Sequence, residues 1–230
     1  DEYQTWKTLP AFAKKFVGWR GLETVVVQQD AENKHDFPGF AEAMNGADLL
    51  VISVRRRALS QENLALIRKH LERGRPLVGI RTTSHAFAPR GEDAGKGVAW
   101  TEFDAEVLGG NYTGHHGKTE PTTVHLPDHG LVHPILTGID LDELTGHGSL
   151  YKAGPLKESA TPILTGVIPN RPAEPVAWVN TYGPRRAKVF YTSFGHEEDF
   201  ADPQFRRLLL NGMLWALNQP IPPDDRLQPR

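Results

Sequence analysis

Three places in the chain combine histidine with residues that could assist it in proton transfer. His115 and His116 are adjacent in the glycine loop GHHG, which is flexible enough to turn both rings toward one site. His196 precedes the acidic run EED, and His85 ends the polar stretch RTTSH. Imidazole changes charge near neutral pH and also binds metals. These histidines are therefore candidates for general acid–base catalysis or for ligating a divalent metal.

The stretch PLVGIRTTSHAF, residues 76–87, indicates a buried strand that runs into a polar corner. In many α/β proteins such a corner presents a nucleophile. Here the corner begins with Arg81, whose guanidinium stays protonated and cannot attack a carbonyl. The hydroxyls of residues 82–84 could attack only with a base such as His85 within hydrogen-bond reach. The corner therefore indicates where a ligand lies more strongly than it indicates a nucleophile.

Strand and helix patterns alternate on both sides of this corner, which is typical of a doubly wound parallel sheet. Apolar runs predict strands at 22–30, 48–54 and 76–80. Apolar residues at helical spacing predict helices at about 5–17 and 60–73, with a short helix before Gly46. Ser60 is the expected N-cap of the second of these helices.

The second half of the chain is less regular and richer in strand patterns. A helix is expected in WTEFDAEVLGG, and strands are expected in TTVHL, SLYKAG, TPILTGVI, PVAWVN and KVFYTSFG. An amphipathic helix that Asp202 caps should close the domain over DPQFRRLLLNGMLWALN. We therefore expect one α/β domain over residues 1–218, with β-strands added in its C-terminal half. The polar, proline-rich segment 219–230 is expected to form a tail.

Ligands of open α/β sheets bind beyond the carboxyl ends of the strands, and several polar residues of this chain are expected there. A crevice with tyrosine, arginine, glutamate and histidine suits a polyhydroxylated ligand, which needs many directional donors and acceptors. The expected lining residues are Glu2, Tyr3, Arg55, Arg81, His85, Tyr112, His115, His116 and His196.

We assign roles within this set by residue type. His116 and His196 are the preferred acid–base or ligating pair, with Glu2 or Glu197 as the carboxylate that orients one of them. His85 is a further catalytic candidate. Substrate contacts are expected from Tyr3, Arg55, Arg81, Tyr112 and His115.

A divalent metal and a phosphate remain alternative ligands of this site. A divalent metal would take its ligands from His85, His115, His116 and His196, although the chain has no HExxH motif. The run Arg55-Arg56-Arg57 suggests a phosphate, but three consecutive arginines cannot all face one site.

Composition limits the other classes of function. The chain of 230 residues has a formal net charge of -2, which offers no reason to expect nucleic acid or an anionic membrane as a partner. No apolar run approaches the roughly 18 residues that span a bilayer. The chain has no cysteine, which excludes disulfides and thiolate nucleophiles. We expect a soluble protein, with the compartment, cytoplasmic or periplasmic, and a homodimer left open.

Six stretches together resemble the ThuA-like (trehalose utilisation) family, over about Glu2 to Leu217. The most specific is the pairing of VFYTSFGHEEDF with FRRLLLNGMLWAL, and the others are LLVISVRRRALS, PLVGIRTTSHAF, WTEFDAEVLGGNYTGHHG and HPILTGI. The resemblance implies a flavodoxin-like, mostly parallel sheet like that of class I glutamine amidotransferases. It also implies that a central first strand precedes this chain, because family members have an apolar strand upstream of a DEY-like stretch.

The resemblance implies a role in carbohydrate metabolism, in some family members on trehalose or 3-keto glycosides. Arg81 stands where class I amidotransferases carry their cysteine nucleophile, so we do not expect glutamine hydrolysis. We expect a bacterial-type enzyme that hydrolyses, eliminates or isomerises a glucoside or its keto form. The alternative is a non-catalytic module that binds or senses a sugar.

Overall fold

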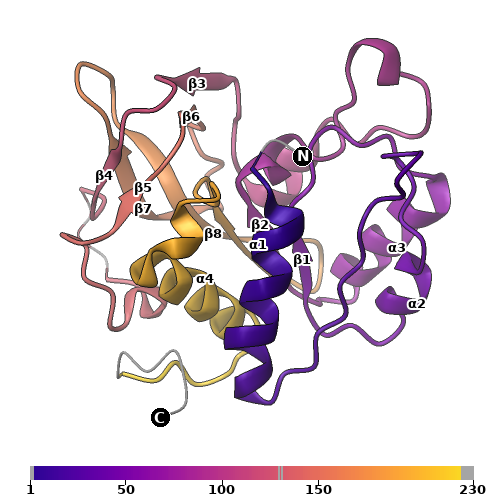
Figure 1. Ribbon diagram of the computed structural model, residues 1–230, viewed down its shortest axis with the longest axis horizontal. Helices are drawn as coiled ribbons and strands as arrows, with labels where there is room; N and C mark the ends of the chain where they lie inside the picture. The colour runs from indigo at the N-terminus through magenta and orange to yellow at the C-terminus, as the bar shows by residue number, and fades with distance from the viewer. Residues whose placement is uncertain (1–2, 129, 131, 224–230) are drawn as a thin grey trace.

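A seven-stranded sheet forms the centre of the computed structural model, which describes residues 3–128, 130 and 132–223 (Figure 1). The strand order is β1-β2-β9-β8-β7-β4-β5. Its strands are β1 (Leu50–Ile52), β2 (Leu77–Ile80), β4 (Thr122–His125), β5 (Thr145–Gly146), β7 (Thr161–Val167), β8 (Glu174–Tyr182) and β9 (Ala187–Thr192). A separate two-stranded sheet pairs β3 (Gly114–His116) with β6 (Leu150–Lys152).

The sheet has a parallel part and an antiparallel part. β1, β2 and β9 pair in parallel, and β8, β7, β4 and β5 follow by antiparallel pairing. Tracing these pairings shows that β1, β2, β9, β7 and β5 run in one direction and that β8 and β4 run in the other. The expected α/β fold, with strands added in the C-terminal half, is confirmed.

Helices cover both faces of this sheet (Figure 1). The α-helices are α1 (Thr5–Phe12), α2 (Phe40–Met44), α3 (Gln61–Glu72) and α4 (Pro203–Ala216). Shorter helical turns are η1 (Ala13–Val17), η2 (Gly18–Arg20), η3 (Arg81–His85), η4 (Gly91–Asp93), η5 (Asp104–Leu108), η6 (Pro134–Leu136) and η7 (Asp199–Ala201). The caps of α3 and α4 are confirmed, since Ser60 accepts from the Asn63 amide and Asp202 from the Gln204 amide. No helix in the described ranges is long and apolar enough to cross a bilayer.

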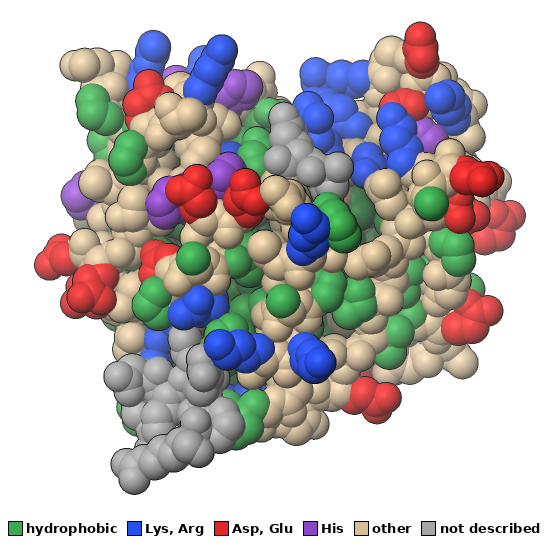
Figure 2. Space-filling model, in the orientation of Figure 1, with side chains coloured by type: hydrophobic (Ala, Val, Ile, Leu, Met, Phe, Trp, Pro, Cys, Tyr) green, Lys and Arg blue, Asp and Glu red, His purple; other side chains and the backbone are tan. Residues whose placement is uncertain are grey.

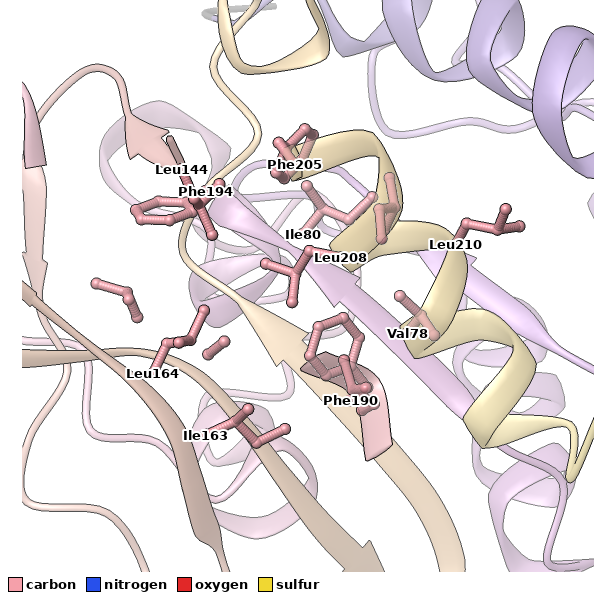
Figure 3. Close-up of a cluster of buried hydrophobic side chains, with 14 of the residues drawn as sticks. Val78, Ile80, Leu144, Ile163, Leu164, Phe190, Phe194, Phe205, Leu208 and Leu210 are labelled. Carbon is pink, nitrogen blue, oxygen red and sulfur yellow. The ribbon is translucent and has the colours of Figure 1, made fainter. Parts of the chain in front are cut away.

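Alternate residues of the central strands pack into two different hydrophobic cores, one on each face of the sheet. Val78, Ile80 and Phe190 pack under α1 and α4, in the cluster of Figure 3. Leu77 and Val189 face the other way, toward α3 and η5. The central strands are therefore buried on both faces, as their continuous apolar sequences predicted.

The strand expected at residues 22–30 does not form. These residues belong to no helix or strand of the structure, and β1 pairs only with β2 among the described strands. Val25 is 69% exposed and Val26 is 50% exposed. A β-branched run becomes a strand only with a neighbour to accept its hydrogen bonds, and local propensity cannot supply that neighbour. The expected further strand upstream of Asp1 lies outside this chain and stays a prediction.

Gly212 in α4 offers a test of this packing. A methyl group on Gly212 would overlap the ring of Phe190 in β9. We expect Gly212→Ala to lower the free energy of unfolding by about 1–3 kcal/mol, the usual cost of overpacking a core. Helix propensity alone predicts the opposite sign, because alanine exceeds glycine by about 1 kcal/mol in a helix.

Urea denaturation of the two proteins measures this difference. Gly18→Ala is the matched control, because its new methyl group would meet its nearest neighbour, the Ala13 carbonyl oxygen, only at 3.8 Å. A Gly212→Ala protein as stable as the wild type would contradict the packing of α4 on β9.

Candidate functional site

The polar corner after β2 is a strained turn. Arg81 follows the last residue of β2 with a φ of 46°, in the left-handed region that non-glycine residues rarely adopt. The Tyr191 hydroxyl donates to the Arg81 carbonyl at 2.6 Å. The Thr83 hydroxyl donates to the Ile52 carbonyl at 2.6 Å, which ties the turn to the end of β1. The turn therefore places its side chains at the carboxyl ends of the parallel strands.

Arg81 is 1% exposed, and its guanidinium contacts protein rather than solvent. Nη1 donates to the Ser193 carbonyl at 2.7 Å and Nη2 to the Ser149 carbonyl at 3.3 Å. The guanidinium also lies over the rings of Tyr3 and Tyr151, at 4.1 and 4.8 Å. Both terminal nitrogens are thus engaged. Arg81, expected to hold ligand oxygens, joins the walls of the site in this structure.

Aromatic rings extend from Arg81 in two directions. His85 stacks on Tyr112 with ring centroids 4.5 Å apart, and Tyr112 lies 4.7 Å from Tyr151. On the other side, Tyr3 meets the edge of His196 at 5.6 Å. We call this cluster of polar and aromatic side chains at the carboxyl ends of the parallel strands the crevice. Figure 2 shows a notch at the top of the molecule. The structure thus brings together His85, His196, Tyr3, Tyr112 and Arg81, and their role in binding a ligand stays a prediction.

Tyr112 is held in place by a buried carboxylate. The Tyr112 amide donates to Oδ2 of Asp104 at 2.6 Å, and Oδ1 of Asp104 is buried without a hydrogen-bond partner. Burial raises the pKa of Asp104 to about 6, because the charged form loses hydration that one amide replaces only in part.

His85 is buried and stays neutral. Burial first, and then the positive charges of Arg56, Arg55, Arg90 and Arg81, together lower the pKa of His85 to about 3. Its Nδ1 lies 3.0 Å from the Ser84 hydroxyl, so the contact that a Ser84 nucleophile would require is present. An imidazole with a pKa this low is a weak proton acceptor near pH 7. His85 therefore suits hydrogen bonding to a ligand better than activation of Ser84.

Asp199 is completely buried and organises two histidines. Oδ1 accepts from the His147 amide at 2.8 Å and from His147 Nδ1 at 2.9 Å. Oδ2 accepts from the Gly195 amide at 2.7 Å and the His196 amide at 2.8 Å. A carboxylate on Nδ1 fixes the tautomer and the orientation of a histidine ring. Asp199 therefore makes Nε2 the proton acceptor of the neutral His147 ring, 3.7 Å from a carboxylate oxygen of Glu198.

The neutral His196 ring carries its proton on the other nitrogen. Its Nδ1 accepts from the Glu198 amide at 3.4 Å, which places the proton of the neutral ring on Nε2. Glycine at position 148, with a φ of 74°, lets the chain after His147 approach closely. A methyl group there would come within 2.6 Å of Arg81 Nη2 and 3.2 Å of His196 Cδ2. The site therefore combines a proton acceptor on His147 with a proton donor on His196.

His115 and His116 lie on opposite faces of β3. In the pairing with β6, His115 stands opposite Tyr151 and His116 opposite the core residue Leu150. Paired residues share a face and successive ones alternate, so His115 lies on the face of Tyr151. His116 Nε2 instead contacts Glu174 at 3.1 Å. The structure therefore does not pair His116 with His196, because the alternation of the strand turns His116 away from the crevice.

The contacts described so far do not include three other predicted site residues. Glu2 lies outside the described residues. Arg55 is exposed just after β1, and Glu197 accepts from the Gln4 side chain at 2.6 Å. Within the described part of the chain, no three histidine, aspartate or glutamate side chains gather as a metal would require. His85, His115, His116 and His196 thus form no such group.

Comparison with known proteins agrees with this architecture. The family model described as "Trehalose utilisation" (ThuA) matches residues 5–216. The chain belongs to the ThuA family. A ThuA-like protein from Parabacteroides merdae is 18% identical, with a TM-score of 0.68, and the match covers 95% of this chain and 88% of that one. A ThuA-like protein from Bacteroides uniformis is 16% identical, with a TM-score of 0.57, over 76% of this chain and 71% of that one. No curated protein matches the sequence.

The sequence analysis did not identify three residues of this candidate site. His147 is one of several histidines scattered among glycine, proline and aspartate, with no local pattern of its own. Asp199 belongs to the acidic run after His196, and Tyr151 to an expected strand. The glycines on both sides of His147 were the available signal, since they permit close packing against another segment.

Proposed function

We propose that the crevice binds a sugar and that this ThuA-family protein converts a glucoside, such as trehalose or its 3-keto form, by elimination, hydrolysis or isomerisation. One observation carries the proposal: Asp199 binds both the His147 ring and the His196 amide, which brings a proton acceptor and a proton donor to the carboxyl edge of the sheet. The tyrosine and histidine rings of the crevice supply flat surfaces and polar edges that suit the C–H faces and hydroxyls of a sugar.

The two histidines suit the chemistry of a keto sugar in particular. In a 3-keto glucoside the C2 proton is acidic because it lies next to the carbonyl. His147 Nε2 would take this proton, and the electron pair would form the C1–C2 double bond as the C1–oxygen bond breaks. His196 Nε2 would donate a proton to the departing oxygen. Hydrolysis and isomerisation need the same acceptor and donor.

A non-catalytic sugar-binding module is the second candidate. The observation that favours it is the strained turn after β2, which presents Arg81 where a nucleophile would stand. Binding needs the crevice walls but not the tautomers that Asp199 imposes on His147.

Incubation of the purified protein with trehalose, a methyl glucoside and their 3-keto forms separates these candidates. We expect NMR to show consumption of a keto form in D₂O, with exchange of the proton next to the ketone, in parallel runs with and without divalent metals. Binding without product or exchange under every condition would establish the binding module. Absence of both binding and turnover would overturn the sugar site itself.

A further inference from the structure

A two-stranded ribbon carries two rings of the crevice. It consists of residues 111–116, which include β3, and residues 150–154, which include β6, and Figure 1 shows both strands near the top of the molecule. Tyr151 lies on β6, and Tyr112 lies just before β3. The Thr113 amide still donates to a β6 carbonyl, at 3.0 Å, so Tyr112 belongs to the paired segment. A two-stranded sheet is marginally stable by itself, so contacts with other elements must hold these rings in place.

Glu174, the first residue of β8, binds both strands of this ribbon. Its Oε1 accepts from Nε2 of His116, the last residue of β3, at 3.1 Å. Its Oε2 accepts from the amides of Ala153 and Gly154, just after β6, at 3.0 and 3.1 Å. One side chain therefore links β3 and the end of β6 to the seven-stranded sheet.

These contacts are largely shielded from water. The Glu174 side chain is 12% exposed and the His116 side chain is 9% exposed. A carboxylate that loses its hydration in this way needs hydrogen-bond donors from the protein. A shift of the ribbon would take these donors away, so Glu174 favours the present position of both strands. Asp104 fixes the Tyr112 end of the ribbon separately, through the Tyr112 amide.

We propose that Glu174 is a positioning residue for the ligand of the crevice: by holding the ribbon against β8, it sets where Tyr112 and Tyr151 meet the sugar. The inference rests on the proposed sugar site and adds to it a residue that acts through the ribbon. Asp199, which orients His147, belongs to a different segment from Glu174. Glu174 should therefore affect binding of the sugar more than proton transfer.

Steady-state kinetics with the 3-keto form of trehalose tests this role. Glu174→Ala removes all three contacts. We expect its KM to rise about 10-fold or more while kcat changes less than about threefold, the pattern of a lost contribution to binding. Glu174→Gln keeps a side-chain oxygen that can accept from both amides, so its KM should stay within about threefold of the wild-type value. Calorimetric titration with trehalose should give the same order of dissociation constants.

Asp30→Ala is the matched control for the loss of a carboxylate that binds backbone amides. Asp30 accepts from the Glu32 amide at 2.8 Å and from the Asn33 amide at 2.9 Å, both within its own turn. Its described hydrogen bonds include no residue of the ribbon. The KM of this variant should equal that of the wild type.

Circular dichroism establishes that each variant is folded. If Glu174→Ala does not fold, His116→Leu replaces it, because this change removes only the contact with β3 and should still raise KM about threefold or more. A folded variant with wild-type KM, or one that loses kcat instead, would overturn the role of Glu174 and leave the proposed sugar site intact. Wild-type protein that neither binds trehalose nor converts its keto form would instead overturn the proposed function.

Discussion

Replacing Asp199 by asparagine should lower kcat/KM on the substrate by about 100-fold to 10,000-fold, the range seen when a histidine loses its orienting carboxylate. The amide cannot accept from all four donors that now bind Asp199, and it can donate to Nδ1 of His147. A hydrogen bond from the amide to Nδ1 would stabilise the His147 tautomer with its proton on Nε2. The proposed mechanism needs a free lone pair on that nitrogen.

Steady-state kinetics and circular dichroism on the same samples separate chemistry from folding. Asp202→Asn is the matched control, because asparagine caps a helix as well as aspartate does and the Asp202 side chain binds only the Gln204 amide among its described contacts. His147→Gln keeps the buried carboxylate and gives a second route to the same loss if Asp199→Asn folds poorly. Full activity in a folded Asp199→Asn protein would contradict the proposed role.

Acid should destabilise this protein through His85 well before most carboxylates are protonated. The folded pKa of His85 is about 3, against 6.5 in the unfolded chain, so the unfolded state binds the extra proton between these values. The stability that neutral His85 contributes is therefore complete above about pH 6.5 and declines as the pH falls toward 3, by up to about 1.4 kcal/mol per pH unit. The full loss is of the order of 5 kcal/mol.

Asp104 acts in the opposite direction over part of this range. Its folded pKa is raised to about 6 from 3.8, so the folded state binds the proton first and gains stability as the pH falls through 6. Buried His70 and half-buried His133 have lowered pKa values and act in the same direction as His85. The pH profile of the wild type alone is therefore a sum and does not isolate His85.

The difference between wild type and His85→Gln isolates the histidine. We expect the free energy of unfolding, measured in urea from pH 7.5 to about pH 4.5, to fall less steeply in the variant. His125→Gln, at an exposed position on β4, should leave the wild-type slope unchanged. Parallel profiles for wild type and His85→Gln would show that His85 takes up its proton as readily in the folded state as in the unfolded chain.

Local sequence patterns were sufficient for most of the scaffold. The helices α3 and α4, with the caps Ser60 and Asp202, follow from spacing and capping chemistry within a few residues. The strands β2 and β9 follow from short apolar runs. Since parallel strands end at one edge of a sheet, the chain order also predicted that Arg81, His85 and His196 would share a crevice.

Those local patterns could not predict how distant segments pair and pack against one another. Residues 22–30 have a strand sequence but no partner, because pairing depends on which strand lies beside them. His116 belongs to the predicted loop, yet its direction depends on the register of β3 with β6. The burial of Arg81 likewise depends on rings and carbonyls contributed by three separate segments.

The pair of Asp199 and His147 shows the physical reason most directly. The two residues are 52 positions apart, so no periodicity or motif links them. Their hydrogen bond exists because packing brings the loop after β5 against the turn after β9, with Gly148 allowing the close approach. A sequence pattern reports the chemistry available to each segment and the periodicity of its own backbone, whereas the partner that orients a side chain is chosen when the segments pack together.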